Sequence, residues 1–383
     1  MTAFGGREAG VYTDQFEIYH GNANPELARK ISRWLGSEPG QAEVFQFANE
    51  NIFVRIIDNV REKDVFVVQP TCRPVNQSIM ELLIMIDAFK RASAGRITAV
   101  VPYYAYGRSD KKDQPRVPIT ARLVADMISV AGADRLLTMD LHQGQIQGFF
   151  NIPVDELTAV HMFSNYFKKL ALQDLVVVTD LGFAKRARAF AELLNAPLAI
   201  VEKRRYGNLD KAEVVNVIGE VRGRRVIIVD DEIDTAGTLI EIVRALESEG
   251  VNEIYACATH GVLSDPAIER IEKATNLSEV VITDTIPLAP SRHIPKIKVL
   301  SVAPLIGEAI KRIHRGESVG ALFSSEVSFT QEMLLWDEGL DGPGIHQGML
   351  PEMHPGSGLE PSGGGGAPSG DGVPSALPAS AGA

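Results

Sequence analysis

The chain has 383 residues, enough for two domains at roughly 100–200 residues per domain. Its hydrophobic fraction of 45% and charged fraction of 23% exclude a wholly disordered or fibrous protein. A formal net charge of −11 argues against a broad grip on nucleic-acid phosphates, so any phosphate site must be local. We therefore expect a globular protein that binds no nucleic acid.

The sequence also bears on membrane association and redox compartment. It contains no run of about 18 apolar residues, and its first residues lack the basic and apolar regions of a signal peptide. The two cysteines, Cys72 and Cys257, lie far apart and form neither a CxxC pair nor a disulfide framework. These features predict a cytoplasmic protein with no membrane contact.

Short runs rich in Val and Ile alternate with longer amphipathic segments along the chain. The predicted strands are 65–70, 96–104, 134–140, 175–180, 197–203, 225–231 and 253–260. The predicted helices are 25–34, 75–91, 119–130, 185–194 and 236–248. Fully apolar strands separated by helices are typical of a sheet buried on both faces, so the predicted class is α/β with mostly parallel sheets.

The alternation divides into two units with a cleft between them and a tail after them. We expect domains at 14–155 and 156–323. The helical spacing of 301–323 ends in a short extended piece, and this segment could pack back on the first domain. The last 43 residues, 341–383, contain 12 glycines and 7 prolines, which predicts a disordered tail.

The segment VIIVDDEIDTAGTL (226–239) carries the strongest chemical signal. Four apolar strand formers run into two aspartates, and a short loop then opens a helix. A helix N-terminus presents unpaired N–H groups and the positive end of the helix dipole, so this loop suits a phosphate. Gly237 would allow close backbone approach, and the hydroxyls of Thr235 and Thr238 could donate further hydrogen bonds.

Asp230 and Asp231 lie too near that phosphate to bind it, and they suit sugar hydroxyls or a divalent metal. A simpler interpretation is that Asp234 or Thr235 merely caps a helix and that the aspartates face solvent. The full string favours a sugar-phosphate site, because it matches the 5-phosphoribosyl 1-diphosphate (PRPP) motif. Phosphoribosyltransferases, which consume PRPP, and ribose-phosphate diphosphokinases, which make it, share that motif.

Further segments resemble the ribose-phosphate diphosphokinase (PRPP synthetase) family from about Phe16 to Phe323. They are HGNANPELARKI (20–31), PVNQSIMELLIMIDAFKRASA (74–94), VPYYAYGRSDKK (101–112), VPITARL (117–123), DLHQGQIQGFF (140–150) and EKRR (202–205). The resemblance implies two tandem phosphoribosyltransferase-like domains and a homo-oligomer, commonly a hexamer. It also implies transfer of the diphosphoryl group of ATP, with Mg²⁺, to the anomeric hydroxyl of ribose 5-phosphate, which releases AMP.

The resemblance assigns roles to individual residues. His142 and Asp180 follow strand ends and match the family's metal-associated positions. Lys203 and Arg205 match the pair that stabilises the transition state, where positive charge must follow the migrating group. The residues expected to bind ribose 5-phosphate are Arg205, Asp230, Asp231, Asp234, Thr235, Ala236, Gly237 and Thr238.

Nucleotide recognition is where the chain departs from the family. ATP binding is expected from two segments, one with Arg108 and Ser109 and one with Phe47, Asn49, Glu50 and Asn51, the second reaching in from a neighbouring subunit. The family usually has F-S-D-G-E in the second segment, Gln in place of Ser109, and Gly in place of Phe183. These changes leave open a second reading, a non-catalytic synthetase-like regulatory subunit. The retained lysine, histidine and loop residues favour the enzyme.

Overall fold

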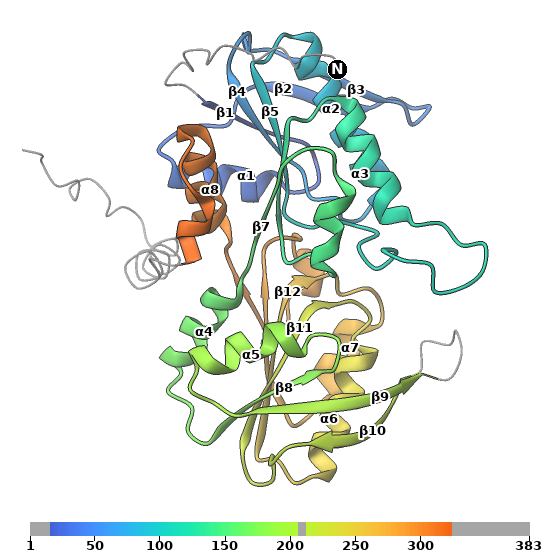
Figure 1. The fold of residues 1–383 in the computed structure, drawn as a ribbon, viewed down its shortest axis with the longest axis vertical. Coiled ribbons are helices and arrows are strands. Elements are labelled where there is room, and N and C mark those ends of the chain that lie inside the picture. Colours follow the sequence, from blue (N-terminus) through green and yellow to red (C-terminus); the bar gives the residue numbers. More distant parts are fainter. Residues whose placement is uncertain (1–15, 206–211, 324–383) are drawn as a thin grey trace, which may run out of the picture. The chain divides into compact units, whose positions relative to one another are not determined.

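The computed structural model describes residues 16–205 and 212–323, and the side chains of 203–205, 212–215, 321 and 323 are not described. The predicted tail at 341–383 therefore lies outside the described residues. The described part contains two large sheets and one separate hairpin, as Figure 1 shows. The described residues belong to one compact unit.

The first large sheet has five strands in the order β1-β4-β5-β6-β7, and every neighbouring pair is parallel. Its strands are β1 (Phe16–His20), β4 (Asp64–Val68), β5 (Arg96–Val101), β6 (Arg135–Met139) and β7 (Val154–Leu157). The antiparallel hairpin of β2 (Ala42–Gln46) and β3 (Ile52–Ile56) interrupts the run between β1 and β4. All five residues of β4 are buried, as a strand covered on both faces requires.

The second large sheet has seven strands in the order β10-β9-β8-β11-β12-β13-β14. Its strands are β8 (Leu175–Asp180), β9 (Leu198–Arg205), β10 (Ala212–Ile218), β11 (Arg225–Ile233), β12 (Glu253–Gly261), β13 (Leu277–Thr283) and β14 (Ile297–Leu300). Only the β9–β10 pair at the edge is antiparallel among these described strands. Strand β11 lies near the centre, so its carboxyl end opens at the edge where α/β sheets bind ligands.

Helices cover the sheets in separate groups. They are α1 (Pro25–Trp34), α2 (Val75–Arg91), α3 (Thr120–Ala131), α4 (Val160–Lys169), α5 (Ala184–Leu193), α6 (Gly237–Ser248), α7 (Ala267–Lys273) and α8 (Ala303–Arg315), with short 3₁₀ turns at 144–149, 290–292 and 319–323. One apolar cluster joins α2 and α3 to the first sheet, and another joins α6 and α7 to the second. A third cluster contains α1, α4, α5 and α8 together with strands of both sheets. The two sheets therefore share one continuous core.

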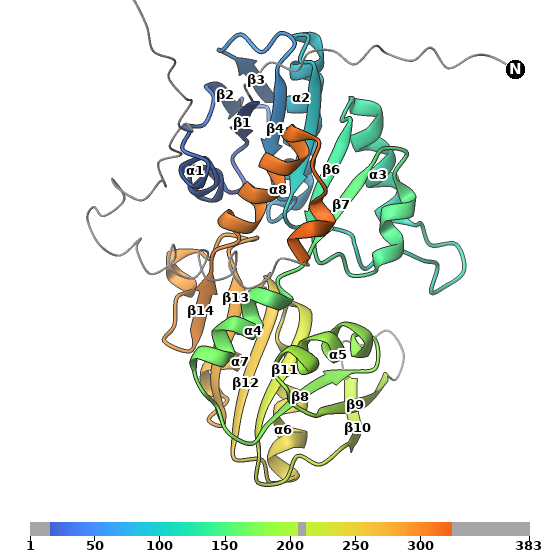
Figure 2. The ribbon, with the colours of Figure 1, turned by 60° about the vertical axis from the view of Figure 1, so that its left-hand side comes forward.

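The C-terminal helix α8 packs against α1 of the N-terminal half, as Figure 2 shows. Gly307 of α8 lies against the Trp34 indole, where a Cβ would meet the ring carbon at 2.5 Å. Asp64 at the start of β4 accepts hydrogen bonds from Arg96 and, at 2.8 Å, from His314. The segment 301–323 thus packs back on the first sheet, and its end is a 3₁₀ turn where an extended piece was expected.

The α/β prediction with mostly parallel sheets is confirmed, and most predicted elements agree within a few residues. Three differences stand out. Strand β9 continues through the basic triplet to Arg205, residues 212–218 form strand β10, which was not predicted, and helices α4 and α7 were not predicted either. Among the helices in the described ranges, none is both long and apolar enough to cross a membrane.

Candidate active site

The predicted phosphate loop follows β11 and leads directly into α6. Strand β11 ends at Ile233 and α6 begins at Gly237, so residues 234–236 form the connection. No side chain caps the first turn of α6, which leaves its backbone N–H groups available to a ligand. The local geometry therefore agrees with the phosphate site predicted from the sequence.

The loop carries backbone strain at Ala236, which adopts a left-handed conformation with φ of 56°. Such a conformation costs a residue with a Cβ on the order of 1 kcal/mol. Arg270 of α7 holds the loop by donating to the Thr235 carbonyl oxygen at 2.8 Å. The same guanidinium lies 3.3 Å from where a Cβ on Gly237 would be, so a larger residue would press on this contact.

His142 and Asp231 form a hydrogen-bonded pair between the two sheets. The His142 Nδ1 lies 2.7 Å from the Asp231 Oδ2, and the Asp231 residue is buried. The hydrogen bond raises the pKa of His142, against the opposing effect of burial. Burial disfavours the charged form of Asp231, but its bond with His142 lowers the pKa of the carboxyl to about 2. The carboxylate therefore fixes the imidazole with Nδ1 as donor and leaves Nε2 for another partner.

Asp230 has a different environment from its neighbour. Successive side chains of a strand point to opposite faces, so the two carboxylates do not share one position. The Asp230 Oδ1 accepts a hydrogen bond from the Asp231 backbone N–H at 2.9 Å, and the side chain is only half-buried. The structure separates the two aspartates that the sequence analysis had grouped together.

Asp180 ends β8 and begins the loop before α5. Its Oδ1 accepts from the Phe183 backbone N–H at 3.0 Å. Phe183 has φ of −101°, an ordinary value, so this backbone does not require the glycine that the family usually has there. The Phe183 ring packs against the shared core, with the Arg186 guanidinium 5.8 Å from its centroid. The phenylalanine is compatible with the loop.

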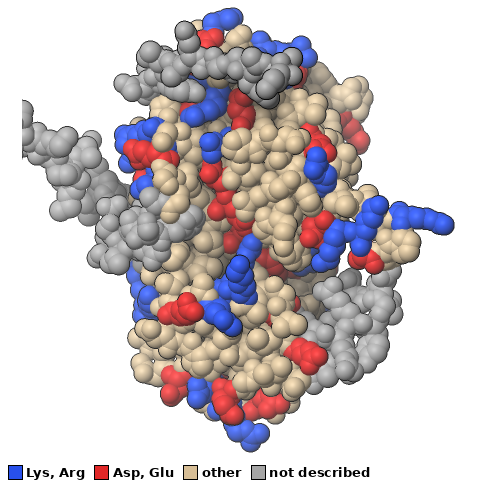
Figure 3. Space-filling view, viewed as in Figure 1, with Lys and Arg blue, Asp and Glu red and all other residues tan. Residues whose placement is uncertain are grey.

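Arg108, in the loop after β5, reaches the second sheet. Its Nε lies 2.8 Å from the Glu232 Oε1 of β11. Its neighbour Ser109 is half-buried, and the Ser109 carbonyl oxygen accepts from the Ala121 backbone N–H at 3.2 Å. The loop that continues from Arg108 carries the Lys and Arg side chains that project at the right of Figure 3, while acidic side chains gather in the middle of that face.

His260 joins the two sheets from the end of β12. Its Nε2 faces the carbonyl oxygens of Met139 and Asp140 at 3.2 and 3.3 Å, so Nε2 carries the proton. Its Nδ1 lies 3.0 Å from the Thr285 hydroxyl and accepts from it. Complete burial lowers the pKa of His260, which keeps the ring neutral. The ring thus supports the end of β6, three residues before His142.

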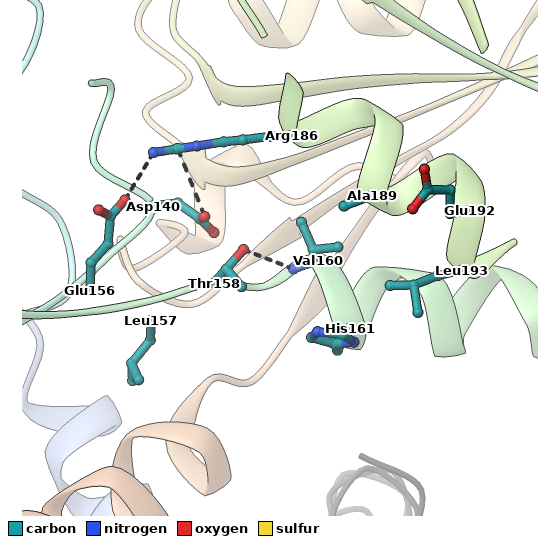
Figure 4. A pocket seen from close by; sticks show the side chains of 10 residues that line it. All are labelled: Asp140, Glu156, Leu157, Thr158, Val160, His161, Arg186, Ala189, Glu192 and Leu193. Carbon is teal, nitrogen blue, oxygen red and sulfur yellow. Dashed lines mark hydrogen bonds and ion pairs between the residues drawn. The ribbon is translucent and has the colours of Figure 1, made fainter. Parts of the chain in front are cut away.

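A second cluster lies on the other side of this strand end. Asp140 accepts from the Thr259 hydroxyl at 2.6 Å, and Arg186 pairs with Glu156 at 2.9 Å. Asp140, Glu156 and Arg186 border a cavity of about 580 Å³, shown in Figure 4. The full lining is Asp140, Glu156, Leu157, Thr158, Val160, His161, Arg186, Ala189, Glu192 and Leu193. None of the site residues predicted from the sequence lines this cavity.

The predicted adenine segment forms the turn of the β2–β3 hairpin. Phe47 is 48% exposed and contacts Phe45 and Phe53, at ring-centroid distances of 5.1 and 5.8 Å. Asn49 accepts from the Asn51 backbone N–H at 3.2 Å, so the turn already uses its side-chain oxygen. Glu50 has φ of 66°. The hairpin presents an exposed aromatic group, as a base-stacking role requires.

Lys203 and Arg205 lie on β9, where they pair with Val214 and Ala212 of β10. Their side chains lie outside the described residues, so their predicted roles stay predictions. The sequence analysis did not assign Glu232, His260, Asp140 or Arg186. Glu232 lies inside the segment 226–239. The run of three acidic residues at 230–232 could have drawn attention to it.

Comparisons with known proteins agree with this geometry. The N-terminal domain of ribose phosphate pyrophosphokinase matches residues 16–132, and the phosphoribosyl synthetase-associated domain matches residues 206–324. The ribose-phosphate pyrophosphokinase of Caldanaerobacter subterraneus is 58% identical over 82% of this chain and 99% of its own length. That of Clostridium acetobutylicum is 53% identical over 81% of this chain and 98% of its own length.

A solved structure gives the same result. The phosphoribosylpyrophosphate synthetase of Mycobacterium smegmatis has a TM-score of 0.74 and 41% identity, and the match covers 79% of this chain and all of that one. A parallel sheet that runs through paired aspartates into a helix-opening loop defines a PRPP-binding α/β protein. Within that class, this chain belongs to the ribose-phosphate pyrophosphokinase family.

Proposed function

We propose that this protein transfers the diphosphoryl group of ATP to ribose 5-phosphate, giving PRPP and AMP. The observation that carries the proposal is the loop at residues 234–238, which opens α6 beside the His142–Asp231 pair. The high identity to relatives named ribose-phosphate pyrophosphokinase supports the catalytic reading and gives no support to the regulatory subunit.

The sugar phosphate is held at the start of α6. The backbone N–H groups of this first turn and the hydroxyls of Thr235 and Thr238 donate to the 5-phosphate. Asp230, half-buried in the carboxyl half of β11, accepts from the ribose hydroxyls. This arrangement fixes the anomeric hydroxyl relative to the nucleotide, which is the main contribution that positioning makes to phosphoryl transfer.

His142 and Asp180 would hold Mg²⁺. A metal-binding histidine usually donates its second ring N–H to a carboxylate, and Asp231 accepts that bond from His142 here. Within residues 16–205 and 212–323, no three His, Cys, Asp or Glu side chains form a ready metal cluster. That agrees with Mg²⁺, which keeps several waters and binds substrate phosphates. When bound, the ion would neutralise charge on the ATP phosphates.

The diphosphoryl group moves when the anomeric oxygen forms a bond to the β-phosphorus and the bond to the α-phosphate oxygen breaks. Negative charge spreads over the migrating group during this step. We assign Arg108 to the ATP phosphates and Lys203 and Arg205 to the charge that develops in the transition state. Phe47 supplies a ring on which the adenine stacks, with Asn49, Glu50, Asn51 and Ser109 at the nucleotide edge.

We also propose that the protein is cytoplasmic and assembles as a homohexamer. Exposed apolar side chains support an assembly, because a surface cluster of this kind is stabilised by burial against a partner. They include Phe45 and Phe47 of the hairpin and Leu123 and Val130 of α3, the last 80% exposed. Light scattering on the purified protein measures the number of subunits.

The direct test is incubation of the purified protein with ATP, Mg²⁺ and ribose 5-phosphate, followed by chromatography. We expect AMP and PRPP in equal amounts, and neither when ribose 5-phosphate is left out. Lys203→Ala should lower kcat by orders of magnitude with little change in ribose 5-phosphate binding, because the charge acts mainly in the transition state. AMP formation without PRPP would contradict the proposal.

A further inference from the structure

Arg108 and Glu232 form an ion pair whose two members differ in exposure. The Arg108 Nε lies 2.8 Å from the Glu232 Oε1, and the side chains are 54% and 10% exposed, respectively. The Glu232 carboxylate is thus nearly buried on the second sheet, and the Arg108 guanidinium reaches it from a loop of the first sheet and stays largely exposed. Glu232 lies inside the quoted motif, but none of the roles assigned above uses it.

The neighbours of Glu232 connect its strand to the first sheet. In the β11–β12 register, Glu232 pairs with His260, whose ring makes two bonds to carbonyl oxygens of the first sheet. The Tyr103 ring packs edge-on against His260 with centroids 5.0 Å apart. Burial raises the pKa of Glu232, and the Arg108 charge opposes this shift. Glu232 therefore lies on a strand that is joined to the first sheet through His260, and Arg108 compensates its charge.

The geometry of the pair leaves one edge of the guanidinium for a ligand. A guanidinium is a planar fork, and Glu232 contacts it through Nε. The two terminal nitrogens lie farther along the exposed side chain, and their plane is set once Nε is held. Arginine side chains lose substantial rotamer freedom on binding, so a side chain that is already held loses less.

We propose that Glu232 is a positioning residue of the nucleotide site, which holds Arg108 by Nε and thereby orients its terminal nitrogens toward the ATP phosphates. The inference rests on the proposed function, in which Arg108 binds those phosphates. It adds a residue of β11 that acts on the nucleotide, beside neighbours that act on the sugar and on His142.

The test compares Glu232→Leu with Glu232→Gln. Leucine removes the acceptor, so kcat/KM for ATP should fall about 10-fold, the scale of a modest misplacement of a binding group. Glutamine keeps the size and polarity of the side chain but not its charge, so it should restore only part of that loss. The KM for ribose 5-phosphate should stay unchanged in both variants, whereas a merely distorted β11 would raise it through Asp230.

A double-mutant cycle shows whether Glu232 acts through Arg108. In an Arg108→Ala background, Glu232→Leu should cause no further loss in kcat/KM for ATP. The matched control is Glu253→Gln, which removes a cross-strand ion pair with Arg225 at the opposite end of β11 and should leave ATP kinetics unchanged. The proposal would be overturned if Glu232→Leu lowered kcat/KM for ATP equally with and without Arg108. It would also be overturned if Glu232→Leu left kcat/KM for ATP unchanged or raised it.

A binding measurement separates this inference from the proposed function. Calorimetry with a non-hydrolysable ATP analogue and Mg²⁺ reports nucleotide affinity without turnover. Suppose that the unsubstituted protein forms AMP, and that Glu232→Leu binds the analogue with the same affinity as the unsubstituted protein. The inference then fails and the proposed function stands. If the unsubstituted protein neither turns over nor binds the analogue, both fail.

Discussion

Asp230 and Asp231 are adjacent in the chain but have different partners. Asp231 is buried against His142, whereas Asp230 is half-buried and bonded to the neighbouring backbone. A sequence motif specifies which residues are present at the end of a strand. It does not specify a partner 89 residues away, as His142 is from Asp231. The division of labour between the two carboxylates therefore needed the structure.

This difference predicts separate kinetic effects for the two asparagine variants. Asp230→Asn should raise the KM for ribose 5-phosphate, because it weakens an acceptor for the sugar hydroxyls. Asp231→Asn should instead raise the Mg²⁺ concentration needed for half-maximal activity by about 10–100-fold, the usual cost of losing the carboxylate behind a metal-binding histidine. Steady-state kinetics with each component varied in turn measures both. Identical profiles for the two variants would contradict the separation.

Glu156 predicts a pH-dependent stability difference. Burial raises the pKa of this carboxyl, assisted by the charge of Asp140 and opposed by that of Arg186. A raised pKa means that the folded state favours the protonated form. The wild type therefore loses stability relative to Glu156→Gln as pH rises from about 4 through the raised value. Thermal denaturation between pH 4 and 8 should show Tm of the variant minus Tm of the wild type increasing.

The control for Glu156 is Glu269→Gln on the surface of α7. Its ion pair with Lys273 lowers the pKa of Glu269, so the corresponding difference in Tm should stay flat or fall over the same pH range. A rise in both variants would show that a general change with pH, rather than the burial of Glu156, produces the effect.

At the scale of elements, apolar spacing predicted the helices, and capping side chains did not decide which ones were found. Helix α1 begins after Asn24, whose side chain accepts from the Leu27 backbone N–H at 3.2 Å, with Pro25 in the first turn. Helices α2, α3, α5 and α6 were predicted although their N-cap residues make no side-chain capping bond. Helices α4 and α7 were not predicted, although the Val160 backbone N–H at the start of α4 donates to the Thr158 hydroxyl at 3.3 Å. Helix α8 packs on α1, which lies far away in the sequence. Helical spacing predicts that a segment is a helix, but it does not predict which helix it packs against.

Asp64 holds α8 in place and gives a stability prediction. Its side chain is 1% exposed and accepts from Arg96 and His314, while Arg96 also donates to the Ile313 carbonyl oxygen at 3.1 Å. Asp64→Ala would leave two side chains without their shared acceptor, which should cost roughly 3 kcal/mol or more in the free energy of unfolding. Chemical denaturation measures this cost.

The control for Asp64 is Asp87→Ala, which removes an exposed pair with Arg91 one helical turn away. Exposed pairs contribute about 0–1 kcal/mol, so this variant should stay close to the wild type. A loss at Asp64 no larger than the loss at Asp87 would mean that α8 is held by apolar packing alone.

At the scale of the whole molecule, the sequence indicates two successive α/β units, and the structure joins them through one core. That cluster contains Ile18 and Phe66 of the first sheet, Val177 and Ile227 of the second, and Ile310 of α8. Strand periodicity shows that both faces of each sheet are covered. It does not show which helices cover them, because the helices of the shared layer come from the start (α1), the middle (α4 and α5) and the end (α8) of the described chain.

The shared core predicts that the two halves do not fold independently. A fragment of residues 1–158 keeps α1 but lacks α4, α5 and α8, so the face of its sheet that carries Ile18, Phe66 and Leu137 would lose most of its cover and become partly exposed to water. Full burial of a large apolar side chain contributes about 1.5–3 kcal/mol. Exposure of several such side chains removes an amount of free energy comparable to the whole stability of a domain, about 5–15 kcal/mol.

We expect calorimetry of the full chain to show one unfolding transition. Each half expressed alone should lack a cooperative transition and should bind a hydrophobic dye. Two resolved transitions in the full chain, or a cooperative transition in the isolated first half, would show that the two sheets are energetically separate and that α8 contributes little to the first.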